Sequence, residues 1–145
     1  MKKENQNMKM NYVLDACALI AAIKQEDGAL IVAELYEDAM RGDINIFINK
    51  VNLLEVYYGF RRDHGKEYAE KILNSVVESV VEVSDINMDV LVEAGRIKSE
   101  YRRLSLADSI ALAEAYVRGG FIVTADHHEM DKLDNAGLVK FMWIR

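Results

Sequence analysis

The sequence predicts an α/β fold in which a parallel sheet of about five strands is covered by helices on both faces. Short apolar runs, typical of buried strands, alternate with stretches in which apolar residues recur at helical spacing. Such alternation indicates an α/β protein with a parallel sheet. Two of the apolar runs lead into an aspartate, Asp15 and Asp126. Open parallel sheets carry their functional sites at the carboxyl ends of strands, so these two residues are the first candidates.

The first half of the chain contains two predicted strands and two predicted helices. The apolar run Tyr12–Leu14 is predicted to be a buried strand. Residues 31–40 carry apolar side chains at helical spacing, and Gly42 is expected to end that helix. Residues 44–48 alternate like a strand, and a helix is predicted from Val51 to Gly59 or shortly after.

The second half continues the alternation. A helix is predicted over residues 68–76 and a strand over residues 80–83. Asp85 is placed as the N-cap of a long helix over residues 86–101, and a further helix is predicted over residues 107–117. The remaining chain is predicted to form a strand, a short helix and a last strand, over residues 121–124, 127–133 and 139–144.

Length and composition restrict the class of protein. A chain of 145 residues favours one domain with a full core. Residues 1–9 are expected to form a flexible lead-in to a domain over residues 10–145, with Met1, Met8 or Met10 as the native start. No apolar run approaches the ~20 residues that a membrane span needs, which predicts a water-soluble protein. Cys17 is the only cysteine, so an intramolecular disulfide is excluded and a reducing cytoplasm is expected.

The net charge of −6 bears on possible partners. A plain nucleic-acid-binding module usually shows a basic footprint, which this chain lacks overall. The same charge is compatible with a metal-dependent nuclease, because bound cations invert the local charge. The function therefore depends on whether the acidic side chains converge.

Four carboxylates are the candidate site residues, and each has a simpler alternative. Asp15 and Asp126 follow strands, where an aspartate can also serve a turn or cap a helix. Glu55 lies among apolar neighbours and could point inward or sit at a solvated edge. Asp108 follows Ser105 by three residues, which is also the spacing of a capping box.

A physical reason connects the four acids. Hard cations such as Mg²⁺ and Mn²⁺ prefer oxygen ligands. Carboxylates packed together repel one another and stay ionised only with a cation among them. One bound ion could activate a water molecule, and two ions could hold both the attacking and the leaving oxygen of a phosphodiester.

The order of these motifs resembles the PIN-domain ribonucleases, and most closely the toxins of VapC-like toxin–antitoxin pairs. The resemblance runs from about Met10 to the C-terminus, with gaps of 40, 53 and 18 residues between positions 15, 55, 108 and 126. It is carried by the segments Leu14-Asp15-Ala16-Cys17, Asn52-Leu53-Leu54-Glu55, Leu106-Ala107-Asp108-Ser109 and Val123-Thr124-Ala125-Asp126. It implies a PIN-like three-layer sandwich in which all four acids bind Mg²⁺ or Mn²⁺ and are catalytic. It also implies single-stranded RNA as substrate, a homodimer and an antitoxin partner.

The resemblance assigns supporting roles as well. Thr124 matches a family hydroxyl near the fourth acid, while Cys17 stands where the family often has Ser, Thr or Asn. Glu129 could add a fifth carboxylate, with a solvated helix face as the alternative. Four arginines are candidates for holding RNA phosphates, with solvated surface pairs as the alternative: Arg61, Arg62, Arg102 and Arg103.

Other classes of protein remain as alternatives. His127 and His128 adjoin Asp126, but adjacent residues do not face the same way on a helix, which disfavours a zinc site. A haloacid-type phosphatase or a receiver domain also places an aspartate after its first strand, yet the phosphatase needs a second one where this chain has Cys17. The last alternative is a non-catalytic PIN-like scaffold that binds a partner.

Overall fold

The computed structural model describes residues 8–128 and 130–145, so most of the lead-in expected over residues 1–9 lies outside the described residues. The described residues form one sheet of five parallel strands in the order β3-β2-β1-β4-β5. The strands are β1 (Met10–Leu14), β2 (Ile44–Asn49), β3 (Glu82–Ser84), β4 (Phe121–Thr124) and β5 (Lys140–Trp143). The predicted parallel sheet of about five strands is confirmed.

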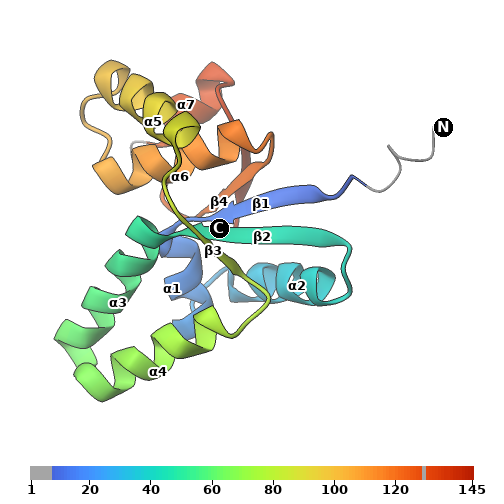
Figure 1. The fold of residues 1–145 in the computed structure, drawn as a ribbon, viewed down its shortest axis with the longest axis vertical. Coiled ribbons are helices and arrows are strands. Elements are labelled where there is room, and N and C mark those ends of the chain that lie inside the picture. The colour runs from blue at the N-terminus through green and yellow to red at the C-terminus, as the bar shows by residue number, and fades with distance from the viewer. Residues whose placement is uncertain (1–7, 129) are drawn as a thin grey trace.

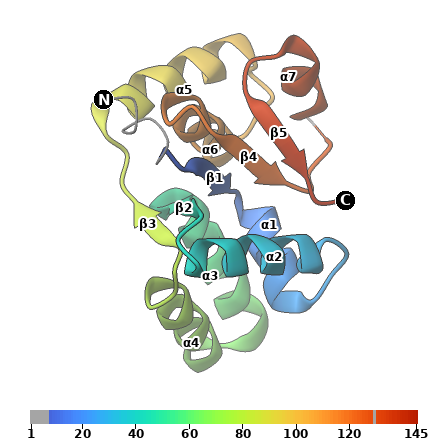
Figure 2. The ribbon, with the colours of Figure 1, turned by 90° about the vertical axis from the view of Figure 1, so that its right-hand side faces the viewer.

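Helices cover both faces of this sheet, which gives the three layers that Figures 1 and 2 show. The helices α1–α4 lie on one face and α5–α7 on the other. Their bounds are α1 (Ala16–Lys24), α2 (Ala29–Met40), α3 (Lys50–His64), α4 (Lys66–Val77), α5 (Met88–Glu100), α6 (Leu106–Val117) and α7 (Met130–Ala136). No helix within residues 8–128 and 130–145 is long and apolar enough to cross a membrane.

The two hydrophobic cores follow from the alternation of side chains along the central strand. In β1, Leu14 packs with the core under α1–α4, and Val13 packs with the core under α5–α7. Both residues are fully buried. A strand that is covered on both faces has a continuous run of apolar residues, which is why Tyr12–Leu14 could be recognised as a buried strand.

The approach of β4 to β1 depends on a glycine. A Cβ atom at Gly120 would lie 2.3 Å from the carbonyl oxygen of Asn11, far inside van der Waals contact. Only glycine lets the chain leave α6 and enter β4 directly beside β1. This close passage matters because Asp15 and Asp126 follow these two strands.

Some expected boundaries were wrong. The segment after Asp15, for which no helix was expected, forms α1. Gly59 does not end α3, which continues to His64. Asp85 is not a helix cap but forms an exposed ion pair with Lys50, and α5 begins after Asn87, whose side chain accepts a hydrogen bond from the Val90 amide at 2.9 Å. Strand β3 begins two residues later than predicted.

Candidate active site

The carboxyl ends of β1 and β4 meet at one edge of the sheet. The two strands are direct neighbours, with Leu14 opposite Val123. The Asp15 amide donates a hydrogen bond to the Val123 carbonyl oxygen at 3.2 Å, which extends the ladder by one residue. Asp15 and Asp126 therefore leave the sheet side by side, as their position after neighbouring strands predicted.

Asp15 is held on both of its carboxylate oxygens. It is the N-cap of α1, and its Oδ1 accepts a hydrogen bond from the Ala18 amide at 2.8 Å. Its Oδ2 accepts a short hydrogen bond from the Thr124 hydroxyl, whose oxygen in turn accepts one from the Asp126 amide at 3.0 Å. Thr124 thus joins the first and the fourth acid, and Asp15 serves as a cap as well as a candidate ligand.

The electrostatics of Asp15 are unusual for an aspartate. The side chain is only 1% exposed, and this burial raises its pKa to about 7. The hydrogen bonds from Thr124 and Ala18 oppose the rise, while the charges of Asp108 and Asp126 add to it. A cation beside the carboxylate would favour its ionised form, so the position suits a metal ligand.

Asp108 lies in the first turn of α6 and reaches the same region. The Ser105 hydroxyl oxygen caps the helix by accepting a hydrogen bond from the Asp108 amide at 3.0 Å. Burial raises the pKa of the Asp108 carboxyl, a hydrogen bond with the Ser105 side chain lowers it, and the charge of Asp126 raises it again. The Asp108 amide therefore takes part in the Ser105 cap, and the Asp108 charge also acts on Asp15 and Glu55.

Glu55 and Asp126 complete the group. Glu55 is half-buried on α3, and its pKa is raised first by burial and then by the charge of Asp108. Asp126 lies in the loop after β4, where its Oδ1 accepts a hydrogen bond from the His128 amide at 3.0 Å. The charge of Asp126 acts on both Asp15 and Asp108. Asp15, Asp108 and Asp126 thus act on one another through their charges, and Glu55 joins the group through Asp108.

The donor set fits a hard divalent cation, although the side chains do not enclose one. Within the described ranges, no three side chains of histidine, cysteine, aspartate or glutamate lie close enough to hold a metal ion. Mutual repulsion keeps uncompensated carboxylates apart. Carboxylate oxygens are nevertheless the ligands that Mg²⁺ and Mn²⁺ prefer. Side-chain movement together with the positive charge of an ion would be needed to close the group.

Cys17 lies among the acids. It is the second residue of α1 and is partly buried. Burial raises the pKa of its thiol to about 12, and the charges of Asp15, Asp126 and Asp108 contribute in that order. A thiol kept protonated in this way is not a ligand for a hard cation, but it is a weak hydrogen-bond donor beside the site.

The histidines after β4 are engaged in different contacts. The His127 ring stacks on Trp143 at 3.8 Å between centroids, and its nitrogens contact Asp131 at 2.9 Å and the carbonyl oxygen of Arg145 at 2.8 Å. This arrangement ties the C-terminus to the start of α7 and does not form part of the acid cluster. Glu129, the candidate fifth carboxylate, lies outside the described residues.

The two arginine pairs lie on different elements, one after Glu55 in α3 and one before Asp108 in α6. Arg61 and Arg62 lie in the last turn of α3, where Arg62 pairs with Asp63 at 2.9 Å. Arg102 and Arg103 lie in the turn that leads into α6 and line a hollow of about 190 Å³. In the part of the chain that the structure describes, neither of these two guanidinium groups forms an ion pair. Because Arg102 and Arg103 directly precede the helix that carries Asp108, this pair is the candidate for a phosphate near Asp108.

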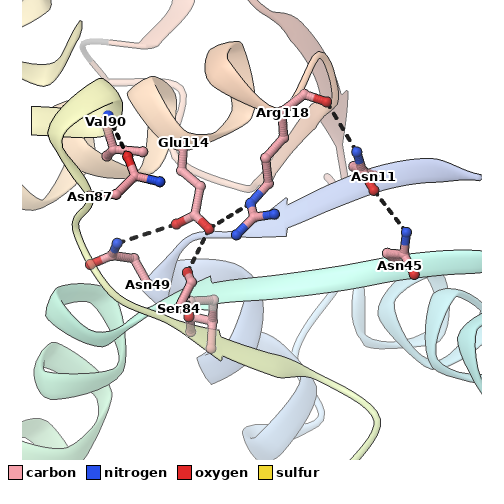
Figure 3. A network of polar contacts seen from close by, with 9 residues as sticks. Asn11, Asn45, Asn49, Ser84, Asn87, Val90, Glu114 and Arg118 are labelled. Atoms are coloured by element: carbon pink, nitrogen blue, oxygen red, sulfur yellow. Dashed lines mark hydrogen bonds and ion pairs between the residues drawn. The ribbon is translucent and has the colours of Figure 1, made fainter. Parts of the chain in front are cut away.

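Three further buried polar residues, at the start of α3 and on α6, were not identified from the sequence: Asn49, Asn52 and Glu114. Glu114 is buried on α6, where its carboxylate contacts Asn49 and two other side chains (Figure 3). The available signal was a lone charge or amide within an apolar run, as in Ile110–Ala115. That pattern indicates a buried polar group but does not reveal its partners.

Comparison with known proteins agrees with this geometry. A family model of the PIN domain matches residues 12–136, so the chain belongs to the PIN domain family. Among curated proteins, none matches the chain in sequence. PIN-domain toxins of the VapC type are nucleases, and membership of this family excludes the phosphatase and receiver alternatives.

Solved structures of VapBC toxin–antitoxin proteins share the fold. DNA-bound VapBC from Salmonella typhimurium superposes with a TM-score of 0.74 at 16% identity, covering 94% of this chain and 99% of that chain. VapBC2 from Rickettsia felis, bound to a promoter DNA fragment, gives 0.71 at 20% identity, covering 92% and 98%. VapC20 from Mycobacterium tuberculosis, a toxin that cleaves the sarcin-ricin loop, gives 0.64 at 16% identity, covering 89% and 97%. The predicted PIN-like three-layer sandwich is confirmed.

Proposed function

We propose that this protein is an endoribonuclease that cleaves single-stranded RNA with Mg²⁺ or Mn²⁺ and acts in the cytoplasm as the toxin of a toxin–antitoxin pair. The observation that carries the proposal is the buried Asp15 carboxyl, whose pKa is raised to about 7 in part by Asp108 and Asp126. A fold gains nothing in stability from such repulsion, whereas a metal site requires converging carboxylates. Membership of the PIN domain family, whose VapC-type toxins are nucleases, supports the nuclease activity.

The side chains divide the work between binding and orientation. Asp15, Asp108, Asp126 and Glu55 would hold the ion. When bound, the ion lowers the pKa of a water molecule and neutralises charge on the phosphate under attack. Thr124 fixes the orientation of the Asp15 carboxylate by donating to its Oδ2. The pKa of Asp15 is raised to about 7, so near neutral pH this carboxyl must lose its proton as the ion binds, and binding strengthens as the pH rises. Burial raises the pKa values of Asp108 and Glu55 as well, which acts in the same direction.

The proposal includes two protein partners. An antitoxin is supported by the solved structures that share this fold, which are toxin–antitoxin complexes in Salmonella typhimurium and Rickettsia felis. A homodimer is supported by apolar surface on α3, where Leu54 and Tyr58 are each more than half exposed and lie four residues apart on one side of the helix. Light scattering of the purified protein tests the homodimer, and a monomer at micromolar concentration would contradict it.

A cleavage assay tests the activity. We expect the purified protein to cut a single-stranded RNA in Mg²⁺ or Mn²⁺ and to lose this activity in EDTA. Asp15→Asn should abolish cleavage, whereas the matched control Asp89→Asn, which changes an exposed carboxylate on α5, should leave it intact. A wild type without metal-dependent cleavage would favour the non-catalytic scaffold.

A crystallographic experiment tests the site directly. Crystals soaked in Mn²⁺ should show anomalous density between Asp15 and Asp126, at oxygen distances of roughly 2.0–2.6 Å. Density at another place, with these two carboxylates apart, would contradict the proposed ligand set.

A further inference from the structure

Glu114 is a buried charge outside the proposed metal ligands. It lies on α6 with 1% of its surface exposed, within the buried and otherwise apolar segment Ile110–Ala115. Figure 3 shows that its carboxylate meets three donors from different elements. The Asn49 amide donates to Oε1 at 3.2 Å, the Arg118 Nε donates to Oε2 at 2.8 Å, and the Ser84 hydroxyl donates to Oε2 over a short distance. One donor therefore meets Oε1 and two meet Oε2.

Asn49 connects this charge to the start of α3. It is the last residue of β2 and the N-cap of α3, and its Oδ1 accepts a hydrogen bond from the Val51 amide at 2.9 Å. Its Nδ2 is the group that donates to Glu114. A single buried side chain thus fixes both where α3 begins and how far it lies from α6.

Asn52 makes a second connection one turn further along α3. It is fully buried, and its Nδ2 donates to the carbonyl oxygen of Ala107 at 3.3 Å. Ala107 directly precedes Asp108, and Glu55 follows Asn52 by three residues, on the same side of the helix. Among the described residues, the Asn52 Oδ1 is the one buried side-chain nitrogen or oxygen atom without a hydrogen-bond partner.

The buried side chains of Asn49, Asn52 and Glu114 are not explained by a contribution to stability alone. Removing a carboxylate and two amides from water is costly, and apolar residues of similar size often stabilise a fold at least as well. An unpartnered buried oxygen adds to this cost. Directional hydrogen bonds do provide something that apolar contacts do not, because they fix one position of α3 against α6 and oppose sliding. The helices they join are those that carry Glu55 and Asp108.

We propose that Asn49, Asn52 and Glu114 form a polar brace whose function is to position Glu55 of α3 relative to Asp108 of α6. The brace residues are positioning residues, since they act through the two helices and do not touch the reacting groups. The inference rests on the proposed function of the four acids. It assigns a role to buried polar groups that the metal chemistry itself does not use.

A reversal of one hydrogen bond tests the brace. In Glu114→Gln, the new oxygen can still accept from Ser84 and Arg118, but the new amide then faces the Asn49 amide, donor against donor. In the double variant with Asn49→Asp, the carboxylate at position 49 accepts from the glutamine and still caps the Val51 amide. The double variant also keeps the total charge of the group. The double variant should therefore restore the hydrogen bond between positions 49 and 114 that each single substitution removes.

The first readout is titration with Mn²⁺ alone, well below the melting temperature. We expect about tenfold weaker binding in Glu114→Gln, at the low end of what partners of metal ligands contribute, and recovery in the double variant. Val76→Ala, which opens a small cavity in the buried face of α4, is the control for lost stability and should bind Mn²⁺ like the wild type. If Glu114→Gln fails to fold, Asn52→Leu replaces it, because leucine has similar volume and lacks both polar atoms.

The second readout needs no metal. Backbone amide chemical shifts should change in Glu114→Gln along residues 50–55 and 106–108, and return in the double variant. Changes confined to the neighbours of position 114, or unchanged Mn²⁺ affinity in a folded variant, would overturn the brace. If the wild type binds no Mn²⁺ but Glu114→Gln shows the expected shift changes, the proposed metal chemistry is overturned and the brace stays in place.

Discussion

Replacing Asp15 by asparagine is expected to stabilise the metal-free protein above neutral pH. The carboxyl is fully buried, and its pKa is raised from 3.8 to about 7, mainly by burial. At 1.36 kcal/mol per pKa unit, this difference destabilises the folded protein by about 4 kcal/mol once the carboxyl is ionised. Asparagine has nearly the same shape and does not ionise. It cannot accept hydrogen bonds from both Ala18 and Thr124, which costs about 1 kcal/mol and leaves a gain of about 3 kcal/mol.

The gain should depend on pH in one direction. Because folding raises the pKa of Asp15, the folded protein keeps a proton that the unfolded chain releases between about pH 4 and pH 7. The stability contributed by this proton is complete below pH 4 and is lost as the pH rises toward 7. The free energy of unfolding of the wild type therefore falls over this interval relative to Asp15→Asn. The difference should be smallest at pH 4 and complete at pH 8.

Urea unfolding in EDTA at pH 5 and pH 8 measures this difference. At pH 8 the variant should also melt roughly 6–12 °C above the wild type, given 2–4 °C per kcal/mol for a chain of this size. Adding Mn²⁺ should stabilise only the wild type, because the ion binds only the intact site. A variant that is less stable than the wild type at pH 8, or a difference that is independent of pH, would refute the electrostatic reasoning.

Three other substitutions probe the same region. Asp108→Asn is expected to abolish cleavage and to raise the melting temperature without metal, because burial raises the pKa of that carboxyl; a lower melting temperature with cleavage retained would reduce Asp108 to a partner of the Ser105 cap. Cys17→Ser is expected to lower the Mg²⁺ concentration needed for cleavage by about tenfold or less, since a hydroxyl is a better hydrogen-bond donor than a thiol. A destabilised protein with an unchanged Mg²⁺ dependence would assign Cys17 to the core. Arg102→Ala is expected to weaken RNA binding in EDTA and to lower the slope of log affinity against log salt concentration by about one. The matched control Arg61→Ala should change neither quantity, and equal effects of the two substitutions would contradict the placement of RNA beside α6.

The positions of the first and fourth acids could be predicted because each follows a buried strand. A strand covered on both faces leaves an apolar run, and its end is visible where a polar residue appears. Asp15 and Asp126 both stand at such ends, and their strands are neighbours in the sheet. Asp108 could be predicted as part of a capping box, since Ser105 precedes it at the right spacing, and the structure confirms the cap.

Other features left no local signal. Helix α1 begins directly after Asp15 with an almost entirely apolar segment, and periodicity does not separate a buried helix from a strand in so short a run. Gly59 is tolerated inside α3 because the packing of neighbours such as Phe60 outweighs its low helix propensity. The partners of Glu114 lie 65 residues away at Asn49 and 30 residues away at Ser84, so no sequence window contains them together.

The hydrogen bond from Thr124 to Asp15 joins residues 109 positions apart, and it has a consequence for synthesis in the cell. A chain emerging from the ribosome contains Asp15 and Glu55 early, but β1 has a free edge until β4 has been made and inserted beside it. The carboxylates can converge only after Asp126 has been translated. A growing chain that has not yet reached Asp126 therefore has no complete cluster of acids while it is still attached to the ribosome.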